Sequence, residues 1–147
     1  MTAFAFNETV PTEVISTALG TGSGNVFVTA DVGKAVKLGT AQNYVLVTGG
    51  NEIEAFVSSV EPFTVNSGYS FGGVVSGGFR EAVVGANQGA TAMAVGDYVV
   101  ADTQTALGTA GAAAVKTGTP TKFLWRCVRI ISGAGAAGSA VLLQRVD

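Results

Sequence analysis

The chain contains no histidine and only one cysteine among its 147 residues. Without histidine, the common Ser–His and Cys–His mechanisms of nucleophilic catalysis are excluded. The single thiol, Cys127, cannot form an intrachain disulfide, and its position inside an apolar run predicts a buried core residue. We therefore expect a protein that is not an enzyme, with no catalytic residues, no cofactor and no metal site.

Charge is also scarce. Charged residues make up 12% of the chain, about half the usual share, and the formal net charge is −2. A weakly acidic chain whose basic residues are scattered lacks the electrostatic footprint that nucleic acid requires, so no nucleic-acid partner is expected. No window approaches the length of apolar sequence that spans a bilayer, and no signal peptide is visible, so no membrane partner is expected either.

Apolar residues and glycine are abundant instead: 48% of the chain is hydrophobic, and 21 residues are glycine. The mean hydropathy is +0.44. A chain of this length has the size of a single domain. Its high apolar content favours a surface that is covered by copies of itself or by a large partner. A compact, robust domain with a neutral surface is the alternative.

One sequence pattern occurs twice. Residues 32–38 (VGKAVKL) are echoed by residues 95–101 (VGDYVVA), and each is a glycine turn that enters a short strand. Each is followed by a longer apolar strand, at residues 53–60 and 122–131. The duplication predicts an all-β fold, a small β-barrel or sandwich with two related halves.

Short β-rich runs separated by glycine or asparagine predict the remaining strands. They lie at residues 26–28, 35–38, 44–48, 79–84, 96–101 and 140–146. Residues 43–60 are expected to form a hairpin, and residues 102–120 a long loop, with a short helix at 111–116 as the alternative. In the strand at 122–131, alternation turns Phe123, Trp125 and Cys127 toward the core and Lys122 and Arg126 outward.

The first 24 residues differ from the rest and are predicted to be an extended N-terminal arm on a β-barrel domain of residues 25–147. Residues 20–24 (GTGSG) form the hinge, and residues 13–19 are expected to carry at most one helical turn. Phe4 and Phe6 alternate with small residues, as anchors of an extended segment do. The interaction residues predicted for the arm are Phe4, Phe6, Val10, Val14 and Ile15. The arm either docks onto a neighbour or adds a strand to its own sheet.

The candidate chemical motifs favour structural roles. Glu52 and Glu54 would share one face of a strand, and a solvated edge is favoured over a paired acid and base. Asp97 follows a glycine and is expected to be a turn residue. Residues 133–138 match G-x-G-x-x-G, but a strand follows them where a dinucleotide site needs a helix. Trp125 is expected in the core rather than in a sugar-binding platform.

The second half resembles the capsid decoration, or cement, proteins of tailed bacteriophages. The resemblance rests on the strand entry at residues 95–100 (VGDYVV), the apolar strand at 123–128 (FLWRCV), and the turn and terminal strand at 136–143 (AAGSAVLL). Residues 32–36 and 56–60 look like an earlier copy of the same unit. The likeness spans about residues 31–146 and does not include the first 24.

This resemblance implies a structural virion protein that is made in the host cytoplasm and binds the outer surface of an expanded phage head. It also implies a homotrimer whose partner is the major capsid protein. Two other classes stay open. A glycan-binding or host-surface-binding module of a virion fibre would require exposed aromatic residues, and a small hydrolase would require carboxylates that converge in a pocket.

Overall fold

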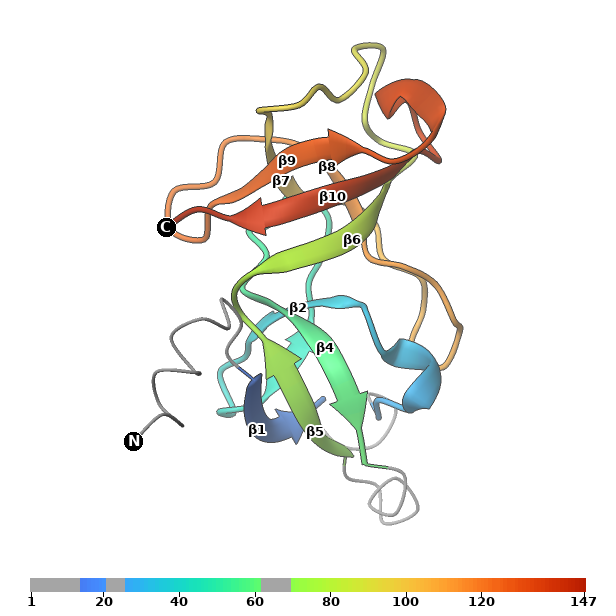
Figure 1. The fold of residues 1–147 in the computed structure, drawn as a ribbon. Helices are drawn as coiled ribbons and strands as arrows, with labels where there is room; N and C mark the ends of the chain where they lie inside the picture. Colours follow the sequence, from blue (N-terminus) through green and yellow to red (C-terminus); the bar gives the residue numbers. More distant parts are fainter. Residues whose placement is uncertain (1–13, 21–25, 62–69) are drawn as a thin grey trace, which may run out of the picture.

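The computed structural model describes residues 14–20, 26–61 and 70–147, and this part of the chain is all-β (Figure 1). The strands of the first half are β1 (Val14–Leu19), β2 (Ala35–Leu38), β3 (Tyr44–Leu46), β4 (Ala55–Val60) and β5 (Ser70–Val75). Those of the second half are β6 (Phe79–Val84), β7 (Tyr98–Ala101), β8 (Ala114–Thr117), β9 (Trp125–Ile130) and β10 (Ala140–Arg145). Short 3-10 helices, η1 (Thr29–Asp31) and η3 (Gly133–Gly135), lie in the described connections.

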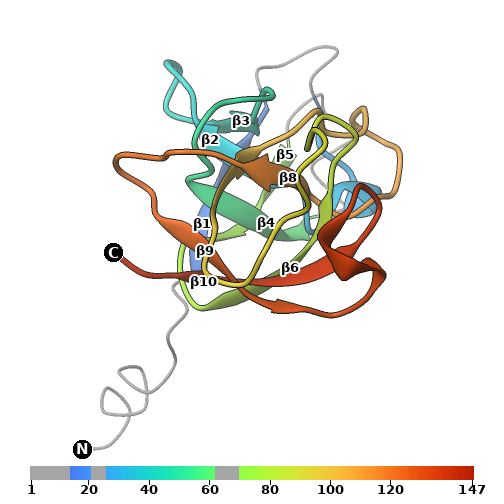
Figure 2. The same ribbon diagram turned by 90° about the horizontal axis from the view of Figure 1, so that it is seen from above.

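Each half closes into a five-stranded barrel, and the two barrels have the same topology. The strand order is β1-β3-β2-β4-β5 in the first and β6-β8-β7-β9-β10 in the second. In each, the first and third strands of the half are parallel, and every other pair is antiparallel. Figure 2 looks down on the second barrel, where β6, β8, β9 and β10 form a ring. The predicted all-β fold with two related halves is confirmed.

The repeated glycine turn occupies equivalent places in the two barrels. Gly33 and Gly96 have φ angles of 92° and 100°, values that glycine adopts without strain. The amide of Gly33 donates to the carbonyl of Val57 on β4, and the amide of Gly96 donates to the carbonyl of Cys127 on β9, both at 2.7 Å. The repeat in the sequence therefore marks the strands β2 and β7, each entered through the same turn and paired with an equivalent strand.

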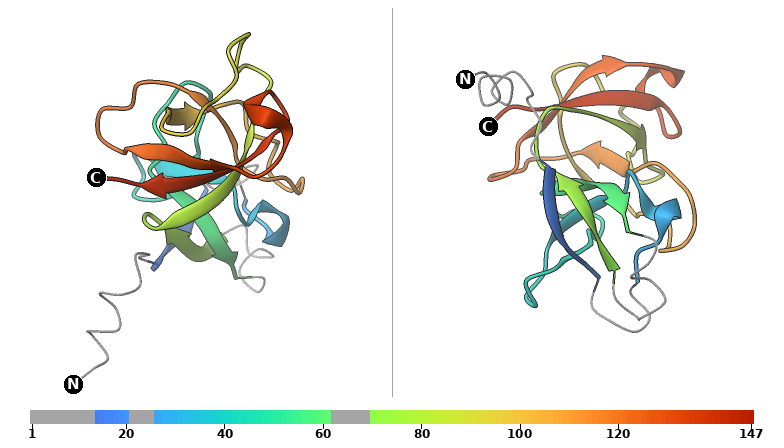
Figure 3. Two further views of the ribbon diagram at one scale, coloured as in Figure 1. Left: turned by 45° about the horizontal axis from the view of Figure 1, so that its top comes forward. Right: turned by 60° about the horizontal axis from the view of Figure 1, so that its bottom comes forward.

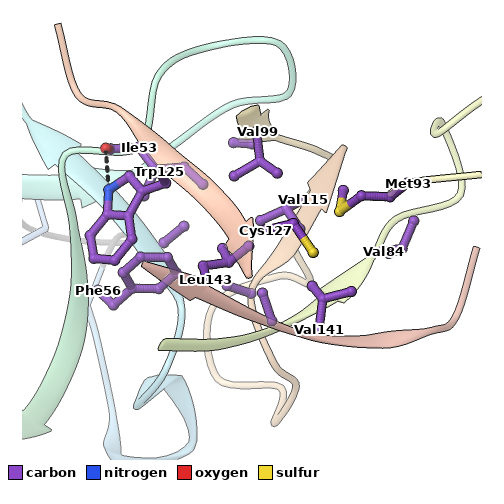
Figure 4. Close-up of a cluster of buried hydrophobic side chains, with 14 of the residues drawn as sticks. Ile53, Phe56, Val84, Met93, Val99, Val115, Trp125, Cys127, Val141 and Leu143 are labelled. Carbon is purple, nitrogen blue, oxygen red and sulfur yellow. Dashed lines mark hydrogen bonds between the residues drawn. The ribbon is translucent and has the colours of Figure 1, made fainter. Parts of the chain in front are cut away.

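Among the described residues, both barrels contribute to the larger of two hydrophobic cores, which is drawn in Figure 4. Trp125 of β9 is fully buried, and its ring meets the ring of Phe56 from β4 edge-on, with centroids 4.9 Å apart. The indole Nε1 donates a 3.1 Å hydrogen bond to the carbonyl of Ile53. Because Phe56 and Ile53 belong to the first half, the core of the second barrel is completed by side chains from the first.

The second barrel in turn contributes a side chain to the core of the first. The connection between β7 and β8, residues 102–113, carries Leu107 to the first barrel's own core, which is built around Phe27, Val36 and Val57. This exchange packs the two halves against each other, because each core contains a side chain from the other half.

The predicted hairpin over residues 43–60 is wrong. Strand β3 pairs with β1 and β2, whereas β4 pairs with β2 and β5. The connection between them crosses to the second barrel, where the amide of Gly50 donates to the carbonyl of Ala101 and the amide of Ala101 donates to the carbonyl of Asn51. The glycine-rich turn forms as predicted, but Gly50 and Asn51 pair with Ala101 of β7 rather than with a hairpin partner.

Two further local predictions fail. The loop predicted over residues 102–120 contains strand β8 at Ala114–Thr117, with Ala113 and Val115 buried on alternate positions, and the alternative helix at 111–116 does not form either. Residues 26–28 form no strand and lead into η1, although Phe27 is buried. In both places the apolar residues enter a core, but the pairing is decided by distant strands, which a short window of sequence does not contain.

The predicted boundary of the arm is also corrected. Residues 14–19 form strand β1 instead of a helical turn, and β1 pairs along all six residues with β5 (Figure 3, right). Strand β5 can lie between β1 and β4 because it carries Gly72, where a Cβ would lie 2.0 Å from the carbonyl oxygen of Ser59. The first barrel thus begins at residue 14, and a boundary at residue 24 would cut it.

The buried indole gives a first prediction. Replacing Trp125 by alanine removes the largest core side chain and its contact with Phe56, so the free energy of unfolding should fall by roughly 3–5 kcal/mol. Urea denaturation followed by circular dichroism measures the loss. The control is Tyr98→Ala, because Tyr98 is 41% exposed and its loss should change the unfolding free energy by only about 0.5 kcal/mol. Equal losses in the two variants would contradict the shared core.

Candidate interaction surface

The residues predicted to carry the arm's interactions fall into two groups. Three of them lie outside the described residues: Phe4, Phe6 and Val10. The other two, Val14 and Ile15, lie on β1, opposite Val75 and Val74 of β5. For residues 14–19, the alternative that the segment adds a strand to its own sheet is therefore the one observed.

The two neighbouring glutamates do not form a catalytic pair. Glu52 accepts hydrogen bonds from the backbone amides of Thr121, Lys122 and Phe123 and from the hydroxyl of Thr121, at 2.6–3.0 Å. These bonds, chiefly that from the amide of Thr121, lower the pKa of Glu52 to about 2. Glu52 therefore connects the first barrel to the segment that precedes β9, a role that the sequence did not indicate.

Glu54 acts within the first barrel. Its carboxylate accepts a 2.9 Å hydrogen bond from the amide of Leu38 and a 3.4 Å bond from the hydroxyl of Tyr44. Burial of Tyr44, together with the charge of Glu54 and this hydrogen bond, raises the pKa of the phenol. The two glutamates thus have separate structural partners, and the geometry supplies no acid and base that face one substrate.

A buried ion pair forms the second connection between the barrels. The Nζ of Lys34 lies 2.6 Å from the carboxylate of Asp31, and both side chains are fully buried. Lys34 also donates to the carbonyl of Ala106, and the amide of Gly108 donates to Asp31. These two backbone groups flank Leu107, so the pair holds the loop whose leucine enters the first barrel's core.

The remaining candidate residues also have structural partners. As predicted, Asp97 is a turn residue, whose carboxylate accepts a 2.8 Å bond from the amide of Ala94. Asp102 is buried; this burial alone would raise its pKa, but hydrogen bonds from Asn87 and Thr103 lower it. Cys127 is buried, as predicted, and burial raises the pKa of its thiol, which disfavours the reactive thiolate.

Within residues 14–20, 26–61 and 70–147, no three His, Cys, Asp or Glu side chains are grouped so that they could hold a metal ion. A search of the same residues finds no helix with the length and apolar character needed to cross a membrane.

The most distinctive surface is the outside of strands β9, β10 and β6, which lie side by side in Figures 1 and 3. The buried residues of β10 are Val141 and Leu143, so alternation turns Ala140, Leu142 and Gln144 outward. We call this surface the outer face. Its three rows, written from β9 through β10 to β6, are Arg126–Gln144–Phe79, Arg129–Leu142–Glu81 and Ile131–Ala140–Val83.

The outer face exposes large apolar side chains. Phe79 is 47% exposed and Ile131 is 42% exposed, at opposite corners of the face. Tyr98 of β7 continues the first row, because it lies opposite Arg126. Arg126 faces outward, as predicted, and is partly exposed. The outer face thus combines exposed apolar side chains with charged side chains of both signs.

The chain was compared with protein-family models, curated proteins and solved structures, and no match was found.

The environment of Glu52 predicts a pH dependence of stability. Because its pKa is lowered to about 2 in the folded protein, its contribution is fully present above the ordinary value of 4.5 and is lost as the pH falls toward 2. Glu52→Gln should lower the unfolding free energy at pH 7 and have a smaller effect at pH 2. Urea denaturation at both pH values measures this difference. Glu81→Gln is the control, because Glu81 is exposed and should leave stability nearly unchanged at pH 7. An effect of Glu52→Gln that is equal at the two pH values would contradict the assignment.

Proposed function

We propose that this chain is a structural virion protein that binds the outer surface of an expanded phage head and stabilises it. Its site of action is the capsid exterior, its partner is the major capsid protein, and it carries out no catalysis. The proposal rests on the resemblance of residues 31–146 to capsid decoration proteins, and the fold is compatible with it.

The observation that best supports a structural role is the way the charged side chains are used. Asp31 and Lys34 bind each other and a loop of the other barrel, and Asp102 binds the residues around it. Glu52 of the first barrel accepts hydrogen bonds from three successive amides of the second. Asp31, Lys34 and Glu52 thus connect the two barrels, and Asp102 fixes a loop within the second. Charged side chains that an enzyme would keep available for substrate are here bound to structural partners, which favours a rigid scaffold.

A glycan-binding or host-surface-binding module is the second candidate. It requires exposed aromatic residues, and Phe71, Phe79 and Tyr98 are exposed. Trp125, the residue best suited to a sugar platform, is buried and therefore unavailable. The exposed aromatic residues supply apolar contact area equally well to a protein partner, so this observation alone does not favour glycan over capsid.

Head binding and the arm are tested together by cosedimentation with emptied, expanded heads. The full chain should cosediment, and deletion of residues 2–12 should weaken binding severely while the barrels stay folded. A deletion through residue 20 is unsuitable because it would remove β1. The double variant Phe4→Ala/Phe6→Ala tests the two anchors, which should dominate the contact energy of the arm, and Asn7→Ala is its control.

The outcomes separate the two parts of this proposal. If the full chain fails to cosediment but is retained by a glycan array, the second candidate replaces the first. If the shortened chain binds heads as well as the full chain, head binding stands and the role of the arm is refuted. Thermal melting of every variant must match that of the full chain for binding losses to be interpreted.

Assembly gives a separate prediction. The low charge and high apolar content favour self-association through apolar side chains, and the resemblance to capsid decoration proteins implies that the assembly is a homotrimer. Light scattering of the full chain at high micromolar concentration should give three times the mass of one chain. A single-chain mass would exclude a preformed trimer, and the same measurement on protein released from heads would then show whether trimers form only on the capsid.

A further inference from the structure

We infer that the outer face of the second barrel is a self-complementary contact surface, through which two copies of this chain associate face to face about a two-fold axis. This inference is independent of head binding and concerns a different surface from the arm.

The middle row of the outer face carries opposite charges on either side of a leucine. Arg129 and Glu81 both lie opposite Leu142, one on each neighbouring strand, so their Cα atoms are two strand spacings, about 10 Å, apart. Both are exposed. Neither forms an ion pair with any described residue; the two ion pairs there are Lys34–Asp31 and Arg145–Asp147. The row thus presents an unpaired cation and an unpaired anion around an apolar centre.

A two-fold axis along β10 makes this row complementary to itself. The axis places Leu142 against Leu142 of the second copy and exchanges the neighbouring strands, so that Arg129 of each copy faces Glu81 of the other. One isologous contact therefore forms two equivalent ion pairs on either side of a leucine pair. The β10 strand is central in the curved face, which brings Leu142 to the middle of the contact.

The same axis also brings favourable pairs of side chains together in the two outer rows. It sets Arg126 against Phe79, a guanidinium over an aromatic ring, and Ile131 against Val83, two apolar side chains. An axis across the strands would instead exchange the first and third rows and oppose Arg126 to Ile131, which leaves a charge against an apolar side chain. The chemistry of the face therefore favours the axis along β10, within the angle of about 30° at which sheets pack.

The face is small, so the contact should be weak. Three short strands supply less than the roughly 1,200 Å² that standard interfaces bury, so we expect association to become measurable only toward millimolar concentration. Such a contact is sparsely populated in dilute solution and becomes significant where many copies are held close together, because the local concentration is then high. If the chain also trimerises through another surface, this contact joins two trimers.

A charge exchange tests the contact by sedimentation velocity of the full chain across micromolar to millimolar concentrations. Glu81→Arg and Arg129→Glu should each weaken self-association about tenfold or more, because each places like charges opposite one another twice. The double variant Glu81→Arg/Arg129→Glu should restore it. A mixture of the two single variants should also associate, since both ion pairs reform between unlike chains. Lys37→Glu, on β2 of the first barrel, changes the net charge as Arg129→Glu does and should leave association unchanged.

Three results would overturn the inference. The first is a wild-type mass that does not rise with concentration. The second is equal weakening by Lys37→Glu and Arg129→Glu, which would indicate a general charge effect. The third is failure of both the double variant and the mixture to associate although all variants keep the wild-type melting temperature. None of these results depends on phage heads, so the inference can fail while head binding holds, and the reverse.

Discussion

The structure depends on the contact between the rings of Trp125 and Phe56, which lies where the two barrels meet. Each half contains roughly sixty residues, a size at which a chain buries only about 60% of its unfolded surface. Two such barrels side by side would each have a marginal core. By placing Phe56 and Ile53 in the second core and Leu107 against the first, the chain links the two cores, so that each barrel buries apolar surface that it could not bury alone.

The exchange of side chains also explains the polar groups that lie between the two barrels. A loop that carries a leucine into another barrel needs contacts that hold its backbone beside that core. Lys34 and Asp31 bind the carbonyl of Ala106 and the amide of Gly108, on either side of Leu107. Glu52 does the same for the segment before β9. These charged side chains therefore serve the packing of the apolar residues.

The sequence predicted what is local and repeated, and missed what is distant. The duplicated glycine turn marked β2 and β7 correctly, and alternation placed Trp125 and Cys127 in the core. The hairpin over residues 43–60 was wrong because the partner of Gly50 is Ala101, far along the chain. Strand β8 was missed because a run of alanine, threonine and glycine has no period of its own. The role of Glu52 could not be predicted either, because a single glutamate before a strand does not indicate which distant amides it will bind.

The one mismatch in the internal repeat has a physical explanation in the structure. Lys34 and Asp97 occupy the same place after the glycine of the turn, and the amide of each closes the turn onto the residue three before it. In the second barrel the side chain of Asp97 stays local and binds the amide of Ala94. In the first, the longer side chain of Lys34 reaches Ala106 of the other half, and Asp31 neutralises its buried charge. The backbone of the turn is thus kept in both copies, while the side chain at this position is free to differ, and in the first copy it joins the two barrels.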